Sequence, residues 1–268
     1  MCWIAGPGEI VMSSRRVAAA WAAALILSLA SLLGAAGQAS AANVLFRDDG
    51  RVQWQQLFKF VGPTCNKIVR NAASLRVTSC AASVSGSKAA MVWAMPKLSG
   101  KIKVEFDYTH FSAAAFTGGT MSGLMLFASG DGSAGWPVDV KTWGAQCCGN
   151  PAGYGPKTWG LQLNFASRTD PRGNSIMRLR ALKGSTASYQ ELLATGPDFP
   201  FINSRTYKFT VVRNGSKITI SVRDNVTNVT KTVTVTHAYI GSLKPGWVGF
   251  RQMQGRSSTF ANVKISDG

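Results

Sequence analysis

The sequence predicts an all-β fold, either a two-sheet antiparallel sandwich or a barrel. Short apolar or alternating segments recur about every ten residues, separated by Gly, Pro, Asn or Ser, which is typical of such folds. The chain has 28 glycines, and strong helix formers are scarce after the first forty residues. Because 46% of the 268 residues are apolar and 15% are charged, the composition excludes disorder and suits one domain.

The first 41 residues are predicted to be a signal peptide. An apolar segment spans residues 17–36 after Arg15 and Arg16, and the small-residue site Ala39–Ala41 follows it. Cleavage after this site leaves a secreted or periplasmic domain of residues 42–268, with no stable membrane span. A retained single-span anchor is the alternative, and Met12 is an alternative start.

Nine strands are predicted in the second part of the chain. They cover residues 101–110, 121–128, 158–166, 176–182, 206–213, 217–223, 231–237, 247–252 and 258–265. In the first of them the alternation places Ile102, Val104, Phe106 and Tyr108 on one face, opposite a face of charged residues.

Residues 206–223 are predicted to form an antiparallel hairpin. Asn214 and Gly215 separate its two strand patterns, and Asn-Gly favours a two-residue type I′ turn.

Four cysteines remain after residue 41, an even number that favours disulfides in an exported chain. Cys65 and Cys80 are the preferred pair, because the segment between them can fold back on itself. The adjacent Cys147 and Cys148 either pair with each other or reach separately to the first two. A zinc site is disfavoured, because no C-x-x-C pair is present.

Residues 129–157 form a long Gly-rich segment that contains Trp136, Trp143, Tyr154 and the adjacent cysteines. Long loops in compact domains are often functional, and aromatic rings stack on the apolar faces of sugars. The segment is therefore a candidate carbohydrate platform. The alternative is that these rings fill a small satellite core under the loop.

The predicted mature domain is strongly basic. Removing residues 1–41 takes away Arg15, Arg16 and Glu9, which leaves 27 basic and 11 acidic side chains and a formal charge of +16. Such a surface attracts polyanions, and an acidic polysaccharide is the favoured partner. Anionic envelope surfaces and a solvated face without a ligand are alternatives, and no nucleic-acid-binding motif supports a specific nucleic acid partner.

Candidate catalytic residues fall into two classes. Glu105 and Asp107 are the carboxylates for glycoside hydrolysis, and their spacing resembles the start of the E-x-D-x-x-E pattern of glycoside hydrolase family 16, although His110 replaces its last Glu. A polysaccharide lyase instead needs a base, for which His110 and Tyr108 are candidates, and groups that neutralise a sugar carboxylate. The candidate substrate-binding residues are Trp136, Trp143, Tyr154, Trp159, Gln162, Asn164, Arg178, Arg180, Arg251 and Gln252.

Several segments together resemble one family in their order and spacing: SGKIKVEFDYTH, SGLMLFASGDG, TWGLQLNFAS, RTYKFTVVRNGSKITISV and GWVGFRQMQGRSSTFANVKIS. They resemble the YesU-like family (domain of unknown function 1961). The resemblance implies a concanavalin A-like jelly roll, a lectin- or glucanase-like sandwich whose concave sheet takes an oligosaccharide. It implies no particular reaction, since one fold hosts many functions.

Taken together, these patterns predict an exported carbohydrate-active protein, either a lyase or hydrolase acting in the concave sheet groove or a non-catalytic, lectin-like binding module. No cofactor is expected. A structural Ca²⁺ is common in this fold class, but no ligand spacing in the sequence demands one.

Overall fold

A computed structural model of the chain describes residues 42–80, 89–111, 122–144, 155–166, 175–184, 190–253 and 256–268. They belong to one compact unit, Ala42–Gly268. The predicted signal peptide, Tyr154, Cys147 and Cys148 lie outside the described residues.

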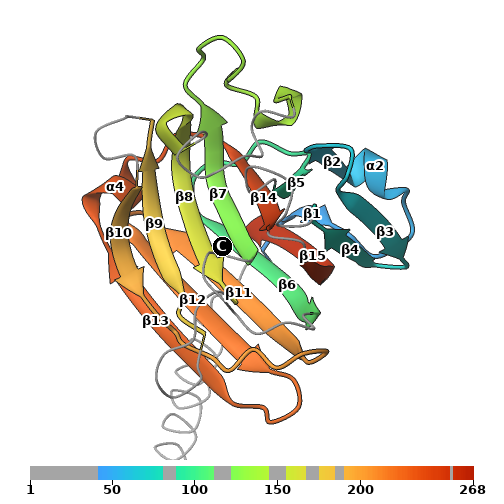
Figure 1. Cartoon of the computed structure of the whole chain (residues 1–268). Helices are drawn as coiled ribbons and strands as arrows, with labels where there is room; N and C mark the ends of the chain where they lie inside the picture. The colour runs from blue at the N-terminus through green and yellow to red at the C-terminus, as the bar shows by residue number, and fades with distance from the viewer. Residues whose placement is uncertain are drawn as a thin grey trace, which may run out of the picture. The chain divides into compact units, whose positions relative to one another are not determined.

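The unit is an antiparallel β-sandwich of two sheets, which confirms the predicted fold class (Figure 1). The larger sheet, here sheet A, contains eight strands in the described chain. Seven lie side by side in the order β13 (Thr230–Thr236), β12 (Lys217–Asp224), β11 (Thr206–Asn214), β6 (Ile102–Phe111), β15 (Ser257–Asp267), β4 (Ser74–Thr78) and β3 (Lys67–Asn71). The eighth strand, β1 (Val44–Arg47), also pairs with β15.

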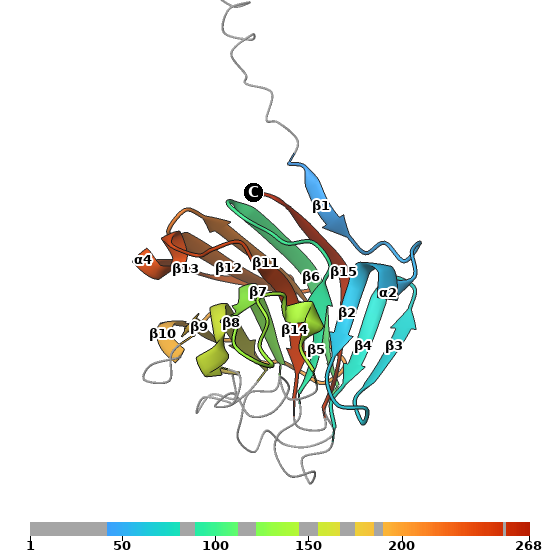
Figure 2. The same ribbon diagram turned by 90° about the horizontal axis from the view of Figure 1, so that it is seen from above.

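Sheet B contains seven described strands and packs against sheet A. Its order is β10 (Gln190–Thr195), β9 (Arg178–Lys183), β8 (Thr158–Phe165), β7 (Ser122–Gly130), β14 (Trp247–Gln252), β5 (Ala90–Ala94) and β2 (Phe58–Val61). Figure 2 shows the two layers, with β13, β12, β11 and β6 above β10, β9, β8 and β7. Each of the nine predicted strands is present within a few residues of its expected bounds.

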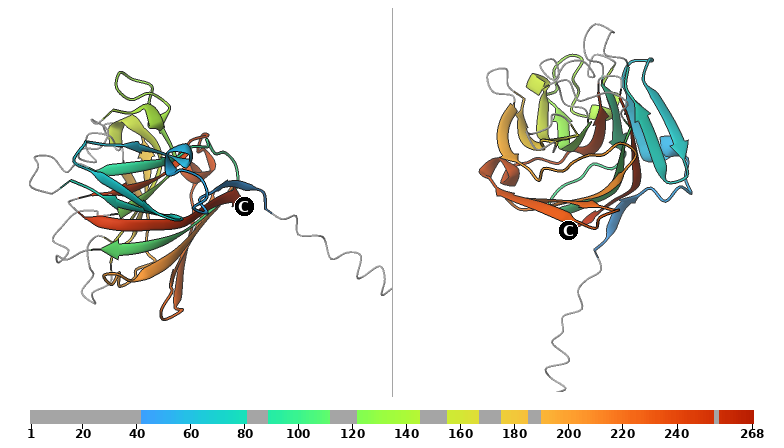
Figure 3. Two further views of the ribbon diagram at one scale, coloured as in Figure 1. Left: turned by 90° about the vertical axis from the view of Figure 1, so that its right-hand side faces the viewer. Right: turned by 60° about the horizontal axis from the view of Figure 1, so that its bottom comes forward.

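Helical elements are short in the described chain. They are α2 (Trp54–Leu57), α4 (Ala238–Gly241) and the 3₁₀ turns η1 (Val140–Thr142) and η3 (Gly155–Lys157). Helix α2 lies with β2, β3 and β4 at the side of the sandwich opposite α4 (Figures 1 and 3). Within the described residues, no helix has the length and apolar character needed to cross a membrane.

The core lies between the sheets, as the alternation of β6 predicts. Residues of β6 are alternately buried and half-buried, and its apolar side chains point inward. The ring of Phe106 stacks on Phe209 of sheet A at 4.8 Å between centroids, and it packs edge-on against Phe250 of sheet B at 5.1 Å. Each such buried aromatic side chain stabilises the sandwich by about 1.5–3 kcal/mol.

Strands β11 and β12 form the predicted hairpin, with Asn214 paired to Lys217. The two turn residues are Gly215 and Ser216. Only Gly215 has a positive φ, at 57°. A positive φ at the first central residue alone is the type II′ pattern, so the predicted type I′ turn was wrong, while the hairpin itself is confirmed.

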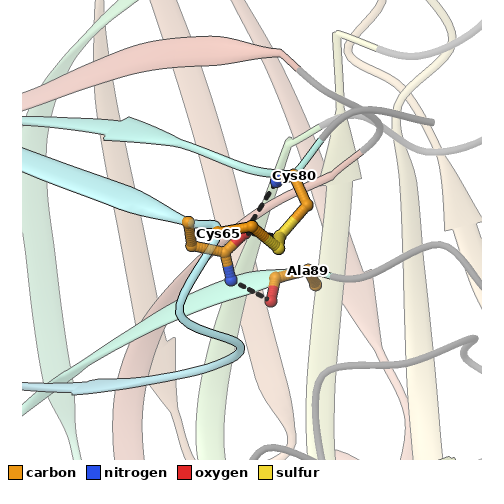
Figure 4. The surroundings of a disulfide bond; sticks show 4 residues. Cys65, Cys80 and Ala89 are labelled. Atoms are coloured by element: carbon orange, nitrogen blue, oxygen red, sulfur yellow. Dashed lines mark hydrogen bonds between the residues drawn. A yellow bond between two sulfur atoms is a disulfide. The ribbon is translucent and has the colours of Figure 1, made fainter. Parts of the chain in front are cut away.

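The disulfide between Cys65 and Cys80 is confirmed, with 5.3 Å between Cα atoms. It joins the two ends of the β3–β4 hairpin (Figure 4). Beside it, the buried amide of Asn66 accepts from the backbone N–H of Cys80 at 2.7 Å and donates to the carbonyl of Ala89 at 3.0 Å. Because Ala89 directly precedes β5, these bonds also tie the hairpin of sheet A to sheet B.

Candidate functional site

The outer face of sheet B is the part of the sandwich that carries the predicted polar binding residues. Side chains of a strand alternate between its faces, and Leu161 and Leu163 of β8 face the core between the sheets. The intervening residues, Gln162 and Asn164, therefore face outward. Both are buried, so this outer face is itself covered.

Strand pairing arranges the outer residues of sheet B in rows that cross the sheet. The first row passes from β9 to β5 through Arg178, Asn164, Gly123, Arg251 and Met91, each paired with the next. Arg178 is half-buried, and Arg251 is only 1% exposed. This row brings two arginines and an amide, all predicted binding residues, onto one face.

The second row lies two residues along the strands. It passes through Arg180, Gln162, Met125, Gly249 and Trp93. Arg180 thus lies on the same strand and the same face as Arg178, as the period of two predicts. The sequence did not identify Met125 or Trp93 as part of this face, because β7 and β5 are buried on both sides and show no alternation.

Gly123 lies in the middle of the first row, where its neighbours approach closely. A Cβ placed there would lie 3.3 Å from the carbonyl oxygen of Leu163, 3.4 Å from Asn164 Oδ1 and 3.8 Å from the Cβ of Arg251. Asn164 is 6% exposed, and its Oδ1 accepts no hydrogen bond in the described part of the chain. A buried acceptor left unpaired costs about 1–3 kcal/mol, so this oxygen is suited to accept a hydrogen bond from a ligand hydroxyl.

The second row ends at a cluster of tryptophans. The indole of Trp93 lies across Gly249, where a Cβ would collide with the ring. Trp143 packs edge-on against Trp93 at 6.0 Å, and Trp136 packs against Trp143 at 5.1 Å. Trp143 is 4% exposed, and its Nε1 donates to the carbonyl of Pro137 at 2.8 Å.

The expectation that Trp143 is an exposed platform residue is therefore corrected. Its ring belongs to a small second core cluster under the loop, as the alternative interpretation of these aromatic residues predicts. Trp136 is half-buried beside it. Tyr154 lies outside the described residues.

The two candidate bases point into the core rather than onto this face. The hydroxyl of Tyr108 lies 3.0 Å from His110 Nδ1 and 2.8 Å from the hydroxyl of Ser122, in a fully buried network. Burial, together with the positive charge of Arg256, lowers the pKa of His110 to about 4. Burial also raises the pKa of Tyr108 above its usual value, although hydrogen bonds with Ser122 and Ser258 oppose this shift.

The two candidate carboxylates lie on the outer face of sheet A. Glu105 pairs with the ammonium of Lys103 at 3.0 Å, and Asp107 accepts from the Nδ2 of Asn262 at 2.7 Å. The structure therefore separates Glu105, Asp107, Tyr108 and His110 from the rows of sheet B.

Gln252 is also separated from its neighbour Arg251, because adjacent residues of a strand face opposite sides. Gln252 faces the core, where its Oε1 accepts from the hydroxyl of Ser122 at 2.8 Å. The remaining predicted binding residue, Trp159, lies near the beginning of β8, away from Asn164 at the other end of that strand.

Metal-ligating residues do not gather in the described chain: no three His, Cys, Asp or Glu side chains are placed to hold an ion. Two carboxylates of the loop after β7 have other partners. Asp131 lies 3.3 Å from the ammonium of Lys157, and Asp139 accepts from the backbone N–H of Lys141 at 2.9 Å. Both carboxylates are thus engaged by groups of the protein itself.

Solved structures with the same fold include lectins. A protein of unknown function with a galectin-like fold from Bacillus subtilis is 15% identical, with a TM-score of 0.58 over 85% of this chain and 97% of its own. The lectin UEA-II complexed with galactose is 10% identical, with a TM-score of 0.56 over 84% and 99%. The exoplasmic/lumenal domain of VIP36, in a Ca²⁺/Man3GlcNAc-bound form, is 11% identical, with a TM-score of 0.56 over 84% and 90%.

No family model matches the sequence, and no curated protein matches it. The resemblance to the YesU-like family therefore stays a prediction from its sequence segments. At these identities the neighbours establish a lectin-like sandwich and leave the ligand to be inferred from the residues.

Proposed function

We propose that this protein binds a carbohydrate on the outer face of sheet B, and that its ligand is an acidic polysaccharide. The observation that carries the proposal is the pair of half-buried arginines on β9. Arg178 and Arg180 lie on one face, and each pairs with a residue of β8 that carries a buried amide, Asn164 and Gln162 respectively.

These groups match the chemistry of an acidic sugar. A guanidinium group can donate two parallel hydrogen bonds to a carboxylate, and amide groups can both donate to and accept from hydroxyls. Arg178 and Arg180 are half-buried, so a bound carboxylate would meet them partly shielded from water. The +16 charge of residues 42–268 would concentrate a polyanion near the surface.

The fold and the disulfide support the same proposal. UEA-II and VIP36, which share the fold, are described with galactose and with Man3GlcNAc bound. The disulfide between Cys65 and Cys80 suits an oxidising compartment, as expected for a chain exported by the predicted signal peptide.

The proposal is for binding rather than catalysis. The candidate bases face the core, and the candidate carboxylates lie on sheet A, where Lys103 and Asn262 engage them. No candidate for either the lyase or the hydrolase reaction shares the face of Arg178 and Arg180.

Calorimetric titration with defined oligosaccharides tests this function. The protein is titrated with galacturonate, mannuronate and glucuronate oligomers, and with neutral oligomers of equal length. We expect at least one acidic oligomer to bind more tightly than its neutral equivalent. The double variant Arg178→Gln/Arg180→Gln should weaken that binding by about tenfold or more, since charge-assisted hydrogen bonds are lost.

The charge-matched control is the double variant Arg76→Gln/Arg223→Gln, which removes two exposed guanidinium groups from sheet A. This variant should bind like the unaltered protein. Equal affinities of the Arg178→Gln/Arg180→Gln variant and the control would overturn the site, and no binding across the panel would overturn the function. New reducing ends, or ultraviolet absorbance of an unsaturated uronate, would instead establish cleavage.

A further inference from the structure

An open region lies at the end of sheet B where β7 ends and β8 begins, uppermost in Figure 1. Two adjoining cavities of about 350 Å³ and 250 Å³ share Ser129, Trp159 and Lys244 among their lining residues. We call this region the Trp159 groove. Trp159 is five residues from Asn164 along β8, a distance of about 17 Å in an extended strand, so the groove is distinct from the polar rows.

Trp159 supplies the groove with an exposed aromatic ring. The side chain is 45% exposed, which is unusual here because Trp93, Trp143 and Trp247 are buried. Its indole packs closely on Gly184, where a Cβ would collide with the ring. The glycine thus supports the ring while nearly half of the side chain stays open to solvent, as stacking on a sugar requires.

Two lysines give the groove a positive charge. Lys97 and Lys244 both line it, both are exposed, and neither forms an ion pair with a described residue. The carboxylate of the groove, Asp131, is compensated by Lys157. Burial raises the pKa of Asp131, but hydrogen bonds from Ser133 and the charge of Lys157 outweigh it and lower the pKa overall.

The other lysines near this end of the sheet have partners. Lys141 lies 3.6 Å from Asp139, and Lys183 pairs with Glu191 at 2.5 Å. Among the residues described, the lysines near the exposed ring that lack a carboxylate partner are therefore Lys97 and Lys244. The ammonium of Lys97 also lies 5.2 Å from the centre of the Trp247 ring.

From these contacts we infer that the Trp159 groove binds a sugar ring that carries a carboxylate, that is, a uronate residue of the polysaccharide. The ring of the sugar would stack on Trp159, and its carboxylate would lie against Lys97 and Lys244. This inference rests on the proposed function and adds a second subsite, which selects the acidic sugar, to the polar rows.

The test compares a groove variant with a charge-matched control. Lys97→Gln/Lys244→Gln removes the two groove cations, and Lys67→Gln/Lys217→Gln removes two exposed lysines of sheet A. Titration with a uronate oligomer should show about tenfold weaker binding for the groove variant than for the control. Binding of the neutral equivalent should be the same for both.

Trp159 itself gives a direct signal. In a ¹⁵N–¹H correlation NMR spectrum, the indole N–H of Trp159 is identified as the resonance that is missing from the spectrum of Trp159→Phe. It should shift on titration with a uronate oligomer, and inorganic sulfate at equal ionic strength should leave it unmoved. An equal response to sulfate would indicate a general anion site and overturn the inference.

The outcomes separate the two proposals. If uronate binding depends on Arg178 and Arg180 while the groove variant matches its control, the groove inference fails and the proposed function stands. If the groove variant loses binding while the Arg178 and Arg180 variant keeps it, the protein binds the proposed class of ligand, but in the Trp159 groove and not on the polar rows. If the unaltered protein binds no uronate, both proposals fail.

Discussion

At the scale of single residues, His110 is a candidate catalytic base that the fold buries in the core. Its imidazole is 1% exposed, and its Nδ1 meets the hydroxyl of Tyr108 inside a network that also includes Ser122 and Ser258. The network bridges the sheets, because Ser122 belongs to β7 of sheet B and the other three to sheet A. His110 therefore contributes to cohesion between the layers.

The lowered pKa of His110 predicts a specific loss of stability in mild acid. The folded protein holds His110 neutral with a pKa of about 4, whereas the unfolded chain protonates it near 6.5. The unfolded state then binds the proton more readily, so the free energy of unfolding should fall as the pH drops from about 6.5 towards 4, by on the order of 3 kcal/mol.

Denaturant titrations between pH 7.5 and pH 4 measure this effect, and His110→Gln is the comparison. The variant should lack the decline between pH 6.5 and pH 4.5. Three carboxyl groups also have pKa values that their partners lower: Asp131, Asp224 and Glu191. Their protonation lowers the free energy of unfolding only below about pH 4.5, so it falls in a different pH range from that of His110. An identical decline in protein and variant would contradict the assignment to His110.

Residue alternation accounts for much of what the sequence could predict at this scale. The period of two placed Gln162 with Asn164 and Arg178 with Arg180 on shared faces, and the structure has them so. The same rule separates Arg251 from Gln252, and it separates Tyr108 from Glu105 and Asp107. Which face of each sheet is the core cannot be read from one strand, because it depends on the strands that pair with it.

At the scale of elements, strand length decided which strands the sequence could reveal. The nine predicted strands are mostly long or clearly alternating. Six were not predicted as strands: β1, β2, β3, β4, β5 and β10. They have four to six residues, and β5 is buried on both faces, so its sequence AMVWA carries no alternation.

The β3–β4 hairpin is one of these short elements, and its disulfide is expected to stabilise it. The bond between Cys65 and Cys80 closes a loop with a sequence separation of 15. By restricting the unfolded chain, a loop of this length contributes about 3 kcal/mol. The double variant Cys65→Ser/Cys80→Ser should therefore unfold with a free energy lower by about that amount.

Urea titration with and without a reductant provides the measurement. Reductant should destabilise the unaltered protein and leave the double variant unchanged. The Asn66 bonds to Cys80 and Ala89 use backbone groups of these partners, so they persist in the variant and the difference reports the cross-link. A variant as stable as the oxidised protein would show that the hairpin needs no cross-link.

At the scale of the whole molecule, the sequence predicted a sandwich but not the composition of its faces. The outer face of sheet B combines β9, β8, β7, β14 and β5, which come from distant parts of the chain. Gly123 and Gly249 matter only in this assembly, since one lets Asn164 of the neighbouring strand approach closely and the other makes room for Trp93. Such roles depend on pairings that no local pattern encodes.

The net charge of the molecule gives the last prediction, which concerns salt. Residues 42–268 carry a formal charge of +16, so long-range attraction should supply much of the affinity for a polyuronate. Raising the salt concentration from about 0.1 M to 1 M shortens the screening length from about 10 Å to about 3 Å. Affinity for a polyuronate should fall by at least about tenfold, since exposed charges then cease to act over a distance.

Binding of a neutral oligosaccharide should be insensitive to the same change, because hydrogen bonds and stacking are little screened. Calorimetry at the two salt concentrations, with acidic and neutral oligomers of equal length, makes the comparison. The half-buried Arg178 and Arg180 are screened less than the exposed lysines, so a residual preference for the acidic oligomer should persist at 1 M salt. If the preference for the acidic oligomer vanishes at 1 M salt, the surface charge alone causes it. If the preference is as large at 1 M salt as at 0.1 M, the groups of the site alone cause it.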